Sequence, residues 1–515
     1  MNLRKGIIVC CSILLTVILL IACSDDNTNT VDDSNNNLEN NEDGNNSKED
    51  AEPITITMMS NLHTPEVPDD RIINILEEKT NVRLDIDWVP DSNYDEKLNT
   101  AFSTGSLPQV VSVSSQQLDQ FREAIKDDQF WEIGPYLEDY ENLSKLKDSI
   151  VENTMVNGKV YGLYQGRPLS REGMIYRKDW ADNLGLSEPK TPDDVFEMAR
   201  AFTEDDPDGN GEDDTIGITD FNNLTYGAFK TIASWFGTPN NWGEKDGKLL
   251  PEFMFPEYMD AMDYMKDLRD QGYINQDFPV TSKDEQGDMI KNGTAGIRFG
   301  TIGDVVSLYN DAVEINPDIE YDVHTHIEGP HGEYGIWSIP GYGKMYLFPK
   351  SATETEEDLQ DILEFYDQMM TPEISNLIYW GVEGDHYTVE DGKAKTSNDQ
   401  EKRDRETRAY SSLEIGEPDT NGRYDGFHDY ETKVKAEELI KENEDYLIHD
   451  PTIALESEAF TIHGEKLKVI MEDATYNYIL GEIDEAEFEQ AIEDWKNQGG
   501  DDIIKEYNES WQELE

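Results

Sequence analysis

Strand and helix patterns alternate along residues 53–113, and this alternation constrains the fold more than any other feature of the chain. Apolar and β-branched residues recur at every second position over residues 53–59 and 82–88, as in half-buried strands. Helical patterns over residues 69–79 and near 94–103 lead to a third strand over residues 109–113. The β-α-β-α-β order predicts an α/β fold with an open, mostly parallel sheet. Ligands of such sheets lie beyond the carboxyl ends of the strands, which indicates Asn61 and Ser114.

The length and the charge of the chain limit its organisation and its partners. With 515 residues, it is expected to form two or three lobes, because domains usually hold roughly 100–200 residues. Hydrophobic residues make up 37% of it, which is enough for a core. Its 111 Asp and Glu against 42 Lys and Arg give a formal net charge of −69. This charge argues against nucleic acid and against an anionic lipid surface as partners, because both need clustered Lys and Arg.

The N-terminus has the pattern of a secretory signal. Arg4 and Lys5 precede an uncharged, mostly apolar run over residues 6–22, which ends at Cys23. Residues 20–23, Leu-Ile-Ala-Cys, resemble the bacterial lipobox, in which the cysteine thiol is lipidated and the chain is cut just before it. Residues 1–22 are therefore predicted to be a signal peptide, and Cys23 the lipidation site. An ordinary signal peptide and an uncleaved transmembrane anchor are the alternatives.

The segment behind Cys23 differs sharply from both of its neighbours. Residues 23–52 are rich in Asn, Asp, Glu, Ser and Thr, so they cannot bury a core and are predicted to form a flexible, lipidated tether. The only other cysteines, Cys10 and Cys11, lie in the predicted signal peptide. We therefore expect no disulfide, no thiolate metal site and no cysteine nucleophile in the folded part.

Residues 158–203 carry a series of motifs that resembles a known family. Residues 158–163 read Gly-Lys-Val-Tyr-Gly-Leu, residues 175–180 read Ile-Tyr-Arg-Lys-Asp-Trp, and Pro-Lys-Thr-Pro at 189–192 begins a helix that Thr191 caps. This run resembles the extracellular solute-binding proteins of ABC importers, of the sugar-binding type. The sequence departs from the family at Tyr164, where a proline is commonest.

Further motifs resemble the same family in the same order. The strand at residues 293–300, the strand at 345–351 and the Gly-x-Glu-Gly-x-x-Tyr turn at 381–387 extend the resemblance over roughly residues 53–510. The turn matches the subfamily that serves oligosaccharide importers of Gram-positive bacteria. The resemblance implies a two-lobed α/β body, like that of periplasmic binding proteins, that closes on its ligand by hinge motion. We expect residues 53–166 and about 340–395 in the first lobe, and residues 167–339 and about 396–515 in the second.

An acidic, glycine-containing loop at residues 206–214 predicts a structural Ca²⁺ site. Oxygen donors fall at loop positions 1, 3, 5 and 9, and glycine at position 6 allows the sharp turn of an EF-hand loop. Position 7 would contribute its backbone carbonyl. The glutamate of an EF-hand at position 12 is replaced by Gly217, and position 10, a glutamate in related solute-binding proteins, is Thr215. The alternative is an acidic turn without metal. The predicted ligands are Asp206, Asp208, Asn210, Glu212 and Asp214.

Aromatic and basic residues near the presumed lobe crossings are the candidate ligand contacts. Sugar sites combine flat aromatic platforms with a few hydrogen-bonding groups, although a single tryptophan is more often a core residue. Arg167, Arg171, Arg177 and Arg298 are rare cations in the same places, and one or two of them could hold an acidic sugar through bidentate bonds. The alternative is that each is paired with one of the many carboxylates. Besides Asn61 and Ser114, the predicted contacts are Tyr164, Trp235, Arg298, Trp337, Trp380 and Glu383.

These observations predict a receptor rather than an enzyme. The sequence has no nucleophile-elbow, zinc-protease, P-loop or dinucleotide motif. We expect a monomeric, lipid-anchored receptor on the extracellular face of the cell membrane, which binds a sugar or oligosaccharide and delivers it to an ABC permease. The alternatives are a surface enzyme that acts on polysaccharide and a receptor of the same fold for peptides or another solute.

Overall fold

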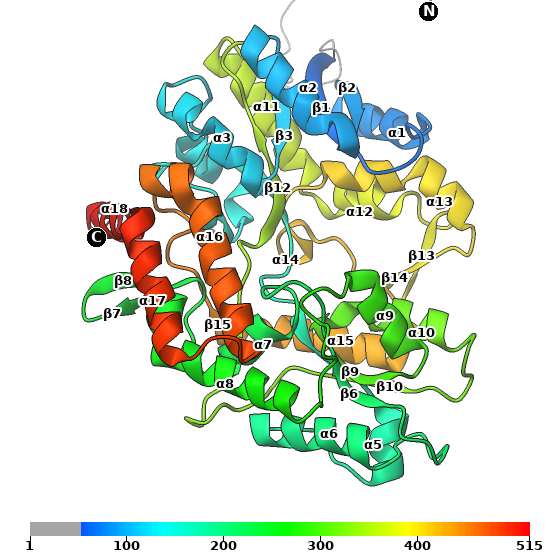
Figure 1. The fold of residues 1–515 in the computed structure, drawn as a ribbon. Helices are drawn as coiled ribbons and strands as arrows, with labels where there is room; N and C mark the ends of the chain where they lie inside the picture. Colours follow the sequence, from blue (N-terminus) through cyan, green and yellow to red (C-terminus); the bar gives the residue numbers. More distant parts are fainter. Residues whose placement is uncertain (1–52, 515) are drawn as a thin grey trace, which may run out of the picture. The chain divides into compact units, whose positions relative to one another are not determined.

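The structure is a computed structural model that describes residues 53–514 (Figure 1). The predicted signal peptide and the whole predicted tether, including Cys23, lie outside the described residues. Within residues 53–514, no helix combines the length and the apolar character needed to cross a bilayer.

A mixed five-stranded sheet forms the centre of the first lobe. Its strand order is β2-β1-β3-β12-β4, in which β1 pairs in parallel with β2 and β3, and β12 runs antiparallel to β3 and β4. The late strand β12 therefore lies between two strands from the first part of the chain, which ties the two regions into one body. The strands are β1 (Ile54–Leu62), β2 (Val82–Pro90), β3 (Val110–Val113), β4 (Gly162–Gly166) and β12 (Tyr342–Leu347).

A mixed four-stranded sheet forms the centre of the second lobe, in the order β10-β5-β9-β6. β6 and β9 are parallel, whereas β5 runs antiparallel to both β9 and β10. Because β5 is antiparallel to both neighbours, its amino-terminal end lies beside their carboxyl-terminal ends. The strands are β5 (Glu172–Arg177), β6 (Ile216–Thr219), β9 (Ala295–Thr301) and β10 (Tyr321–His324).

Helices surround both sheets, as Figure 1 shows. Several helices begin at side-chain caps; Thr191, for example, accepts a hydrogen bond from the backbone N–H of Asp194 in a capping box. In the first lobe the helices are α1 (Arg71–Thr80), α2 (Asp91–Thr104), α3 (Ser115–Lys126), α4 (Asp148–Asn153), α11 (Glu356–Met369), α12 (Pro372–Trp380), α13 (Gln400–Glu406) and α14 (Pro418–Asn421). In the second lobe they are α5 (Lys178–Leu184), α6 (Pro192–Glu204), α7 (Ala228–Trp235), α8 (Pro256–Asp270), α9 (Lys283–Lys291), α10 (Val305–Ala312), α15 (Glu431–Glu442), α16 (Glu458–Ile479), α17 (Glu485–Trp495) and α18 (Asp501–Leu514).

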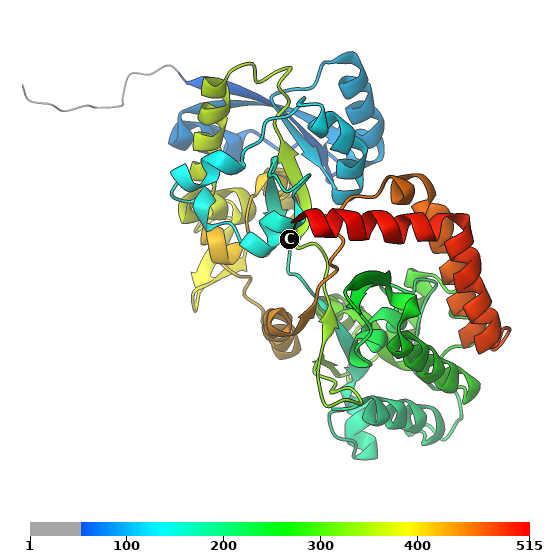
Figure 2. The same ribbon diagram turned by 90° about the vertical axis from the view of Figure 1, so that its left-hand side faces the viewer.

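Three small two-stranded pairings and several short turns complete the structure. The hairpin β7–β8 packs against α18, and α16 packs against α8 and α17, so the C-terminal helices cover one side of the second lobe (Figure 2). The pairs are β7 (Trp242–Lys245) with β8 (Lys248–Pro251), β11 (Ile336–Trp337) with β15 (Leu447–Ile448), and β13 (Tyr387–Glu390) with β14 (Lys393–Thr396). Short 3₁₀ turns lie at Gly134–Asp139, Leu143–Lys145, Glu252–Met254, Ile302–Asp304, Arg408–Leu413 and Asn443–Tyr446, and a π-type turn at Lys496–Gly500.

The expected elements of residues 53–113 are present, and the α/β class is confirmed. Both complete sheets are mixed, although most strands of each run in one direction, as expected. The three predicted strands are parallel, but β12 and β5 enter their sheets in the opposite direction, because each begins where the chain has just crossed between the lobes. Local sequence patterns do not record the direction in which a distant strand joins a sheet.

The hydrophobic cores show which segments pack together. One core lies around the first sheet and contains residues of 56–169 and 342–415; two others lie around the second sheet and draw on residues of 174–327 and 436–507. Tyr410, Leu413 and Ile415, which we expected in the second lobe, pack in the first core. The carbonyl of Ser412, beside Leu413, accepts a hydrogen bond from the hydroxyl of Tyr346 on β12, which holds this segment against the first sheet.

Candidate functional site: an arginine-containing site at the lobe crossing

Residues 167–171 form the segment that crosses from the first sheet to the second. They follow the carboxyl-terminal end of β4 and lead directly into β5. In the first sheet the crossing therefore starts at the edge where β1 and β3 also end. In the second sheet it arrives at the edge where β6 and β9 end. The carboxyl ends of parallel strands are the usual ligand-binding edge of α/β sheets, so this crossing marks the candidate site.

The two arginines of this segment, Arg167 and Arg171, are called the crossing arginines below. Among residues 53–514, neither guanidinium group makes a hydrogen bond or an ion pair. Arg167 lies against β12, since a Cβ atom added to Gly343 would be 2.3 Å from its Nε. Partial desolvation and then the charge of Arg171 lower the pKa of Arg167, whereas Tyr226 and Tyr379 partly offset this shift. Two unpaired cations therefore lie close together at the crossing.

The second lobe adds Arg298 and Glu172 to the same edge. Arg298 on β9 is buried, and its Nη2 lies 3.2 Å from Oδ2 of Asp304. Glu172 begins β5, is 4% exposed, and accepts a hydrogen bond from Oγ1 of Thr301 at 3.2 Å. Burial raises the pKa of Glu172 to about 7, although the charges of Arg171 and Arg298 oppose this shift. This edge of the second sheet therefore places the positive charges of Arg171 and Arg298 near Glu172, whose pKa of about 7 is well above that of an ordinary glutamate.

The first lobe contributes Lys344 and the predicted residue Asn61. Nζ of Lys344, on β12, donates to Oδ1 of Asn61 at 2.8 Å, and Nδ2 of Asn61 donates to Asp91 at 2.8 Å. Burial lowers the pKa of Lys344 to about 7, and the charge of Arg167 lowers it further, while Asp91 raises it. Asn61 thus orients a buried amine at the edge of the first sheet.

Two tyrosines supply the accessible aromatic surface of the site. Tyr226, just before α7, is 52% exposed, and its ring meets Trp337 edge-on at a centroid distance of 5.7 Å. Tyr379, on α12, is half-buried, and the guanidinium of Arg423 lies 3.7 Å from the centre of its ring. Both tyrosines also affect the pKa of Arg167. Flat rings beside cations and hydrogen-bonding groups are suited to sugars with charged substituents.

Three predicted aromatic contacts are buried. Tyr164, Trp235 and Trp337 are 0%, 2% and 3% exposed. The hydroxyl of Tyr164 accepts a hydrogen bond from the backbone N–H of Lys147, and Nε1 of Trp337 donates to Thr231. Trp235 packs edge-on against Phe299. Neighbouring segments cover all three rings, so we do not propose them as platforms.

The remaining predicted contacts lie at the edge or beside it. Arg298 and Asn61 belong to the arrangement described above. Ser114 caps α3 and accepts a hydrogen bond from the backbone N–H of Gln117, so its hydroxyl already has a structural partner. Trp380 is half-buried and donates from Nε1 to the carbonyl of Tyr424 at 3.0 Å, and Glu383 is exposed. Tyr226 was missed although it follows β6, because the rule about strand ends was applied only to the first sheet.

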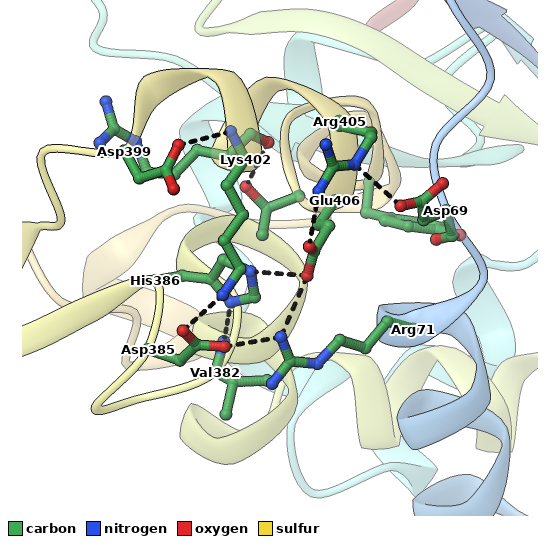
Figure 3. A network of polar contacts seen from close by, with 12 residues as sticks. Asp69, Arg71, Val382, Asp385, His386, Asp399, Lys402, Arg405 and Glu406 are labelled. Carbon is green, nitrogen blue, oxygen red and sulfur yellow. Dashed lines mark hydrogen bonds and ion pairs between the residues drawn. The ribbon is translucent and has the colours of Figure 1, made fainter.

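A polar network around the buried residues His386 and Glu406 fixes the turn at residues 381–387 (Figure 3). Nδ1 of His386 accepts from the backbone N–H of Val382, so Nε2 carries the proton and donates to Glu406 at 3.1 Å. Nη1 of Arg71, on α1, bridges Glu406 at 3.0 Å and Asp385 at 2.6 Å. The Gly-x-Glu-Gly-x-x-Tyr turn thus has a structural role in joining α1, α12 and α13.

The loop at residues 206–214 gathers most of the predicted Ca²⁺ ligands around Asn210. Nδ2 of Asn210 lies 2.9 Å from Asp208 and 3.3 Å from Asp214, and the backbone N–H of Gly211 donates to Asp206. Gly211 has a φ of 80°, which favours glycine at this sharp turn. Within residues 53–514, no group of three or more His, Cys, Asp or Glu side chains comes close enough to hold a metal ion.

Comparisons with known proteins match nearly the whole described chain. Residues 67–374 match the family model described as bacterial extracellular solute-binding protein. The polygalacturonan/rhamnogalacturonan-binding protein YtcQ of Bacillus subtilis is 40% identical over 472 residues, which cover 89% of this chain and 92% of YtcQ. Lipoprotein LipO of the same organism is 36% identical over 471 residues, with the same two coverages.

Solved structures share the fold at low sequence identity. An extracellular solute-binding protein from Bifidobacterium longum subsp. infantis has a TM-score of 0.70 at 16% identity and covers 90% of this chain and 99% of its own. An EF-hand mutant of the substrate-binding protein FusA of S. pneumoniae, in complex with fructo-nystose, has a TM-score of 0.59 at 19% identity and covers 89% of this chain and 99% of its own.

We predict that Asp385→Asn lowers the stability of the protein near neutral pH and has little effect near pH 2. Hydrogen bonds from Lys402 and Arg71 lower the pKa of Asp385 to about 2. A carboxylate with a lowered pKa stabilises the fold above its unfolded pKa of about 3.9, and this contribution is lost as the pH falls toward about 2. Wild type should therefore be more stable than Asp385→Asn above pH about 4, with the difference disappearing toward pH about 2. Thermal unfolding of both proteins from pH 2 to 7 measures this difference; one that persists unchanged at pH about 2 would contradict the prediction.

Proposed function

Because this chain belongs to the bacterial extracellular solute-binding protein family, a family of non-catalytic receptors, we propose that it captures an acidic oligosaccharide between its two lobes and delivers it to an ABC permease. One observation carries the choice of an acidic ligand: the crossing arginines are unpaired among residues 53–514, in a chain with 111 Asp and Glu. The family match confirms the predicted resemblance to extracellular solute-binding proteins and the prediction that the protein is not an enzyme.

The crossing arginines bind a uronate carboxylate, and the nearby tyrosines contact the sugar ring. A guanidinium group presents parallel N–H donors that match the two oxygens of a carboxylate. Tyr226 and Tyr379 are close enough to influence the pKa of Arg167, so a sugar ring held by its carboxylate has aromatic residues nearby. The polygalacturonan-binding relative, at 40% identity, supports the same ligand class. Contacts from both lobes favour the closed form, since a ligand shifts an equilibrium toward the state that it binds better.

The large negative net charge of the protein does not prevent a uronate from binding at the crossing arginines. At physiological ionic strength the Debye length is about 8 Å, so distant surface carboxylates are largely screened from a ligand at the crossing. The nearest charges then decide its binding, and these include Arg167, Arg171 and Arg298. A neutral sugar would accept hydrogen bonds from the two guanidinium groups without neutralising them, whereas a uronate also pairs with their charge and forms the stronger, charge-assisted hydrogen bonds.

Replacing either crossing arginine with glutamine should weaken uronate binding. Hydrogen bonds to charged groups contribute about 1.5–3 kcal/mol, so Arg167→Gln or Arg171→Gln should reduce the affinity for trigalacturonate roughly tenfold or more. The matched control is Arg83→Gln, on β2, because Arg83 is exposed, as Arg167 is, and forms no ion pair among residues 53–514. Isothermal titration with trigalacturonate and with its uncharged galactose counterpart measures the effect. A wild-type protein that binds both sugars equally would contradict the proposal.

The loop at residues 206–214 binds a structural Ca²⁺ ion in this proposal. Asp206, Asp208, Asn210 and Asp214 offer side-chain oxygens and Glu212 a backbone carbonyl, and such hard donors suit Ca²⁺. The hydroxyl of Thr215 donates to the carbonyl of Phe202 and its side chain is buried, so it supports the loop from below. The ion neutralises carboxylates that repel one another in its absence.

Removal of Ca²⁺ should lower the melting temperature, and excess Ca²⁺ should restore it. A ligand that binds only the folded state at a hundred times its Kd stabilises that state by about 2.7 kcal/mol. Asp208→Asn should abolish the response, whereas Asp213→Asn should retain it, because Asp213 is exposed at loop position 8, which supplies no ligand. Melting curves with EDTA and with Ca²⁺ provide the measurement. Identical curves for wild type would leave the loop as an acidic turn.

The protein is held at the extracellular face of the cell membrane by a lipid on Cys23. The support is the lipobox-like sequence at residues 20–23 together with the relative named lipoprotein LipO. A Cys23→Ala variant should be released into the medium or remain unprocessed, because one residue supplies the whole lipid attachment. Cys11→Ala is the matched control and should remain in the membrane fraction. Cell fractionation measures how much of each protein remains with the membrane. If processed Cys23→Ala protein remained there as fully as wild type, the proposed lipid anchor at Cys23 would be wrong.

A further inference from the structure

A cavity of about 500 Å³ opens in the second lobe beside Tyr226. Its walls come from α7, from the β7–β8 hairpin and from the C-terminal helices α16 to α18, elements that are distant in the sequence. Figure 1 shows α16 and α17 beside α7 and α8, on the side of the second lobe that the C-terminal helices cover. The volume falls within the range of small-molecule sites, about 300–1,000 Å³. Neither the crossing arginines nor Arg298 line this cavity.

Eight of the residues that line the cavity are aromatic. Trp242, Tyr258 and Tyr507 line its interior and are buried, whereas Tyr226 and Phe460 stand at its mouth, 52% and 46% exposed. The hydroxyl of Tyr258 is already bonded to Thr475, so its ring rather than its hydroxyl serves the cavity. Flat rings of this kind pack against the apolar faces of sugars.

The charged residues of the cavity disfavour a second carboxylate. The two lysines in its lining are paired with acids: Lys230 lies 3.1 Å from Glu252, and Lys468 lies 3.6 Å from Glu472. Asp450 and Glu465 also line the cavity, so its lining carries more negative than positive charge. Asp450 accepts hydrogen bonds from Asn241 and Thr452, which holds its carboxylate in place. A uronate would meet like charge here, whereas the hydroxyls of a neutral sugar would find acceptors.

Tyr226 links this cavity to the cationic edge at Arg298. Its carbonyl oxygen lies 3.5 Å from the position of a Cβ atom on Gly300, and Nη2 of Arg298 lies 4.0 Å from the same position. Its ring rests on Trp337 and lines the mouth of the cavity. One residue therefore borders both the cationic edge and the aromatic cavity, so neighbouring units of one chain can occupy the two places together.

We infer that the aromatic cavity is a second subsite, which takes an uncharged sugar unit of the oligosaccharide whose uronate binds the crossing arginines. The inference rests on the proposed function and deepens it. The receptor then selects oligosaccharides in which a uronate is linked to a neutral unit over those built of uronates alone. The apolar rings of the cavity favour a neutral unit that bears a methyl group, such as a 6-deoxyhexose.

Filling the cavity should remove this selectivity. Gly464 lies on α16 in the cavity wall, and a Cβ atom there would be 3.0 Å from the half-exposed ring of Phe460, which is able to move. Gly464→Leu also raises helix propensity, so α16 should keep its structure. Titrations with a tetrasaccharide of alternating galacturonate and rhamnose and with tetragalacturonate compare the two ligand types. Gly464→Leu should weaken binding of the mixed tetrasaccharide at least tenfold and leave tetragalacturonate within twofold of wild type.

Matched variants separate cavity filling from general damage. Gly287→Leu places the same change in α9, where a new Cβ atom meets nothing within 4 Å, and it should alter neither affinity. Phe460→Ala removes a ring at the mouth and should also weaken the mixed ligand, whereas Val469→Ala, exposed on the same helix, should not. Melting curves confirm that each variant is folded.

The outcomes distinguish this inference from the proposed function. If wild type binds tetragalacturonate but Gly464→Leu and Phe460→Ala leave the mixed ligand unaffected, the second subsite is refuted and the uronate receptor stands. Equal weakening of both ligands by Gly464→Leu also overturns the selectivity. If wild type binds neither ligand, both the proposed function and the inference fail.

Discussion

The passage of the chain from β4 into β5 is the constraint on which the candidate site depends. It begins at the carboxyl-terminal edge of the first sheet and ends at the amino-terminal end of an antiparallel strand in the second. The binding edges of both sheets are therefore linked by one short segment, and Arg167 and Arg171 lie within it. Arg298, Glu172 and Lys344 reach the same region only because the sheets are joined in this way.

Charge gives this segment its chemical character. Elsewhere in the described chain many arginines are engaged by acids: Arg200 contacts three carboxylates, and Arg71 bridges Asp385 and Glu406. The crossing arginines differ from these, because neither is paired with a carboxylate among residues 53–514. At the crossing, β12 lies on one side of Arg167 through Gly343, and two tyrosines lie nearby. The proposed recognition of a carboxylate thus depends on the lack of an acidic partner for these arginines among residues 53–514 as well as on the arginines themselves.

The aromatic residues divide into a buried set and an accessible set. Trp337 is covered and supports the ring of Tyr226 from below, so a ring predicted as a platform instead holds the exposed one in position. The network around Glu406 has a comparable role in the first lobe, where it fixes the turn that follows Trp380. In both places, buried groups without access to ligand determine where accessible groups lie.

The sequence alone determined the features that depend on neighbouring residues: the strands and helices of residues 53–113, the cap at Thr191, and the sharp glycine turns of the loop at 206–214. Its family motifs also led to the correct class of receptor. Only the tertiary structure decided that Trp235 and Trp337 are buried while Tyr226 is exposed, that Ile415 packs in the first core, and that a cavity forms between α7 and the C-terminal helices. The physical reason is that local patterns act over a few residues, whereas the exposure of a side chain depends on segments that arrive from hundreds of residues away.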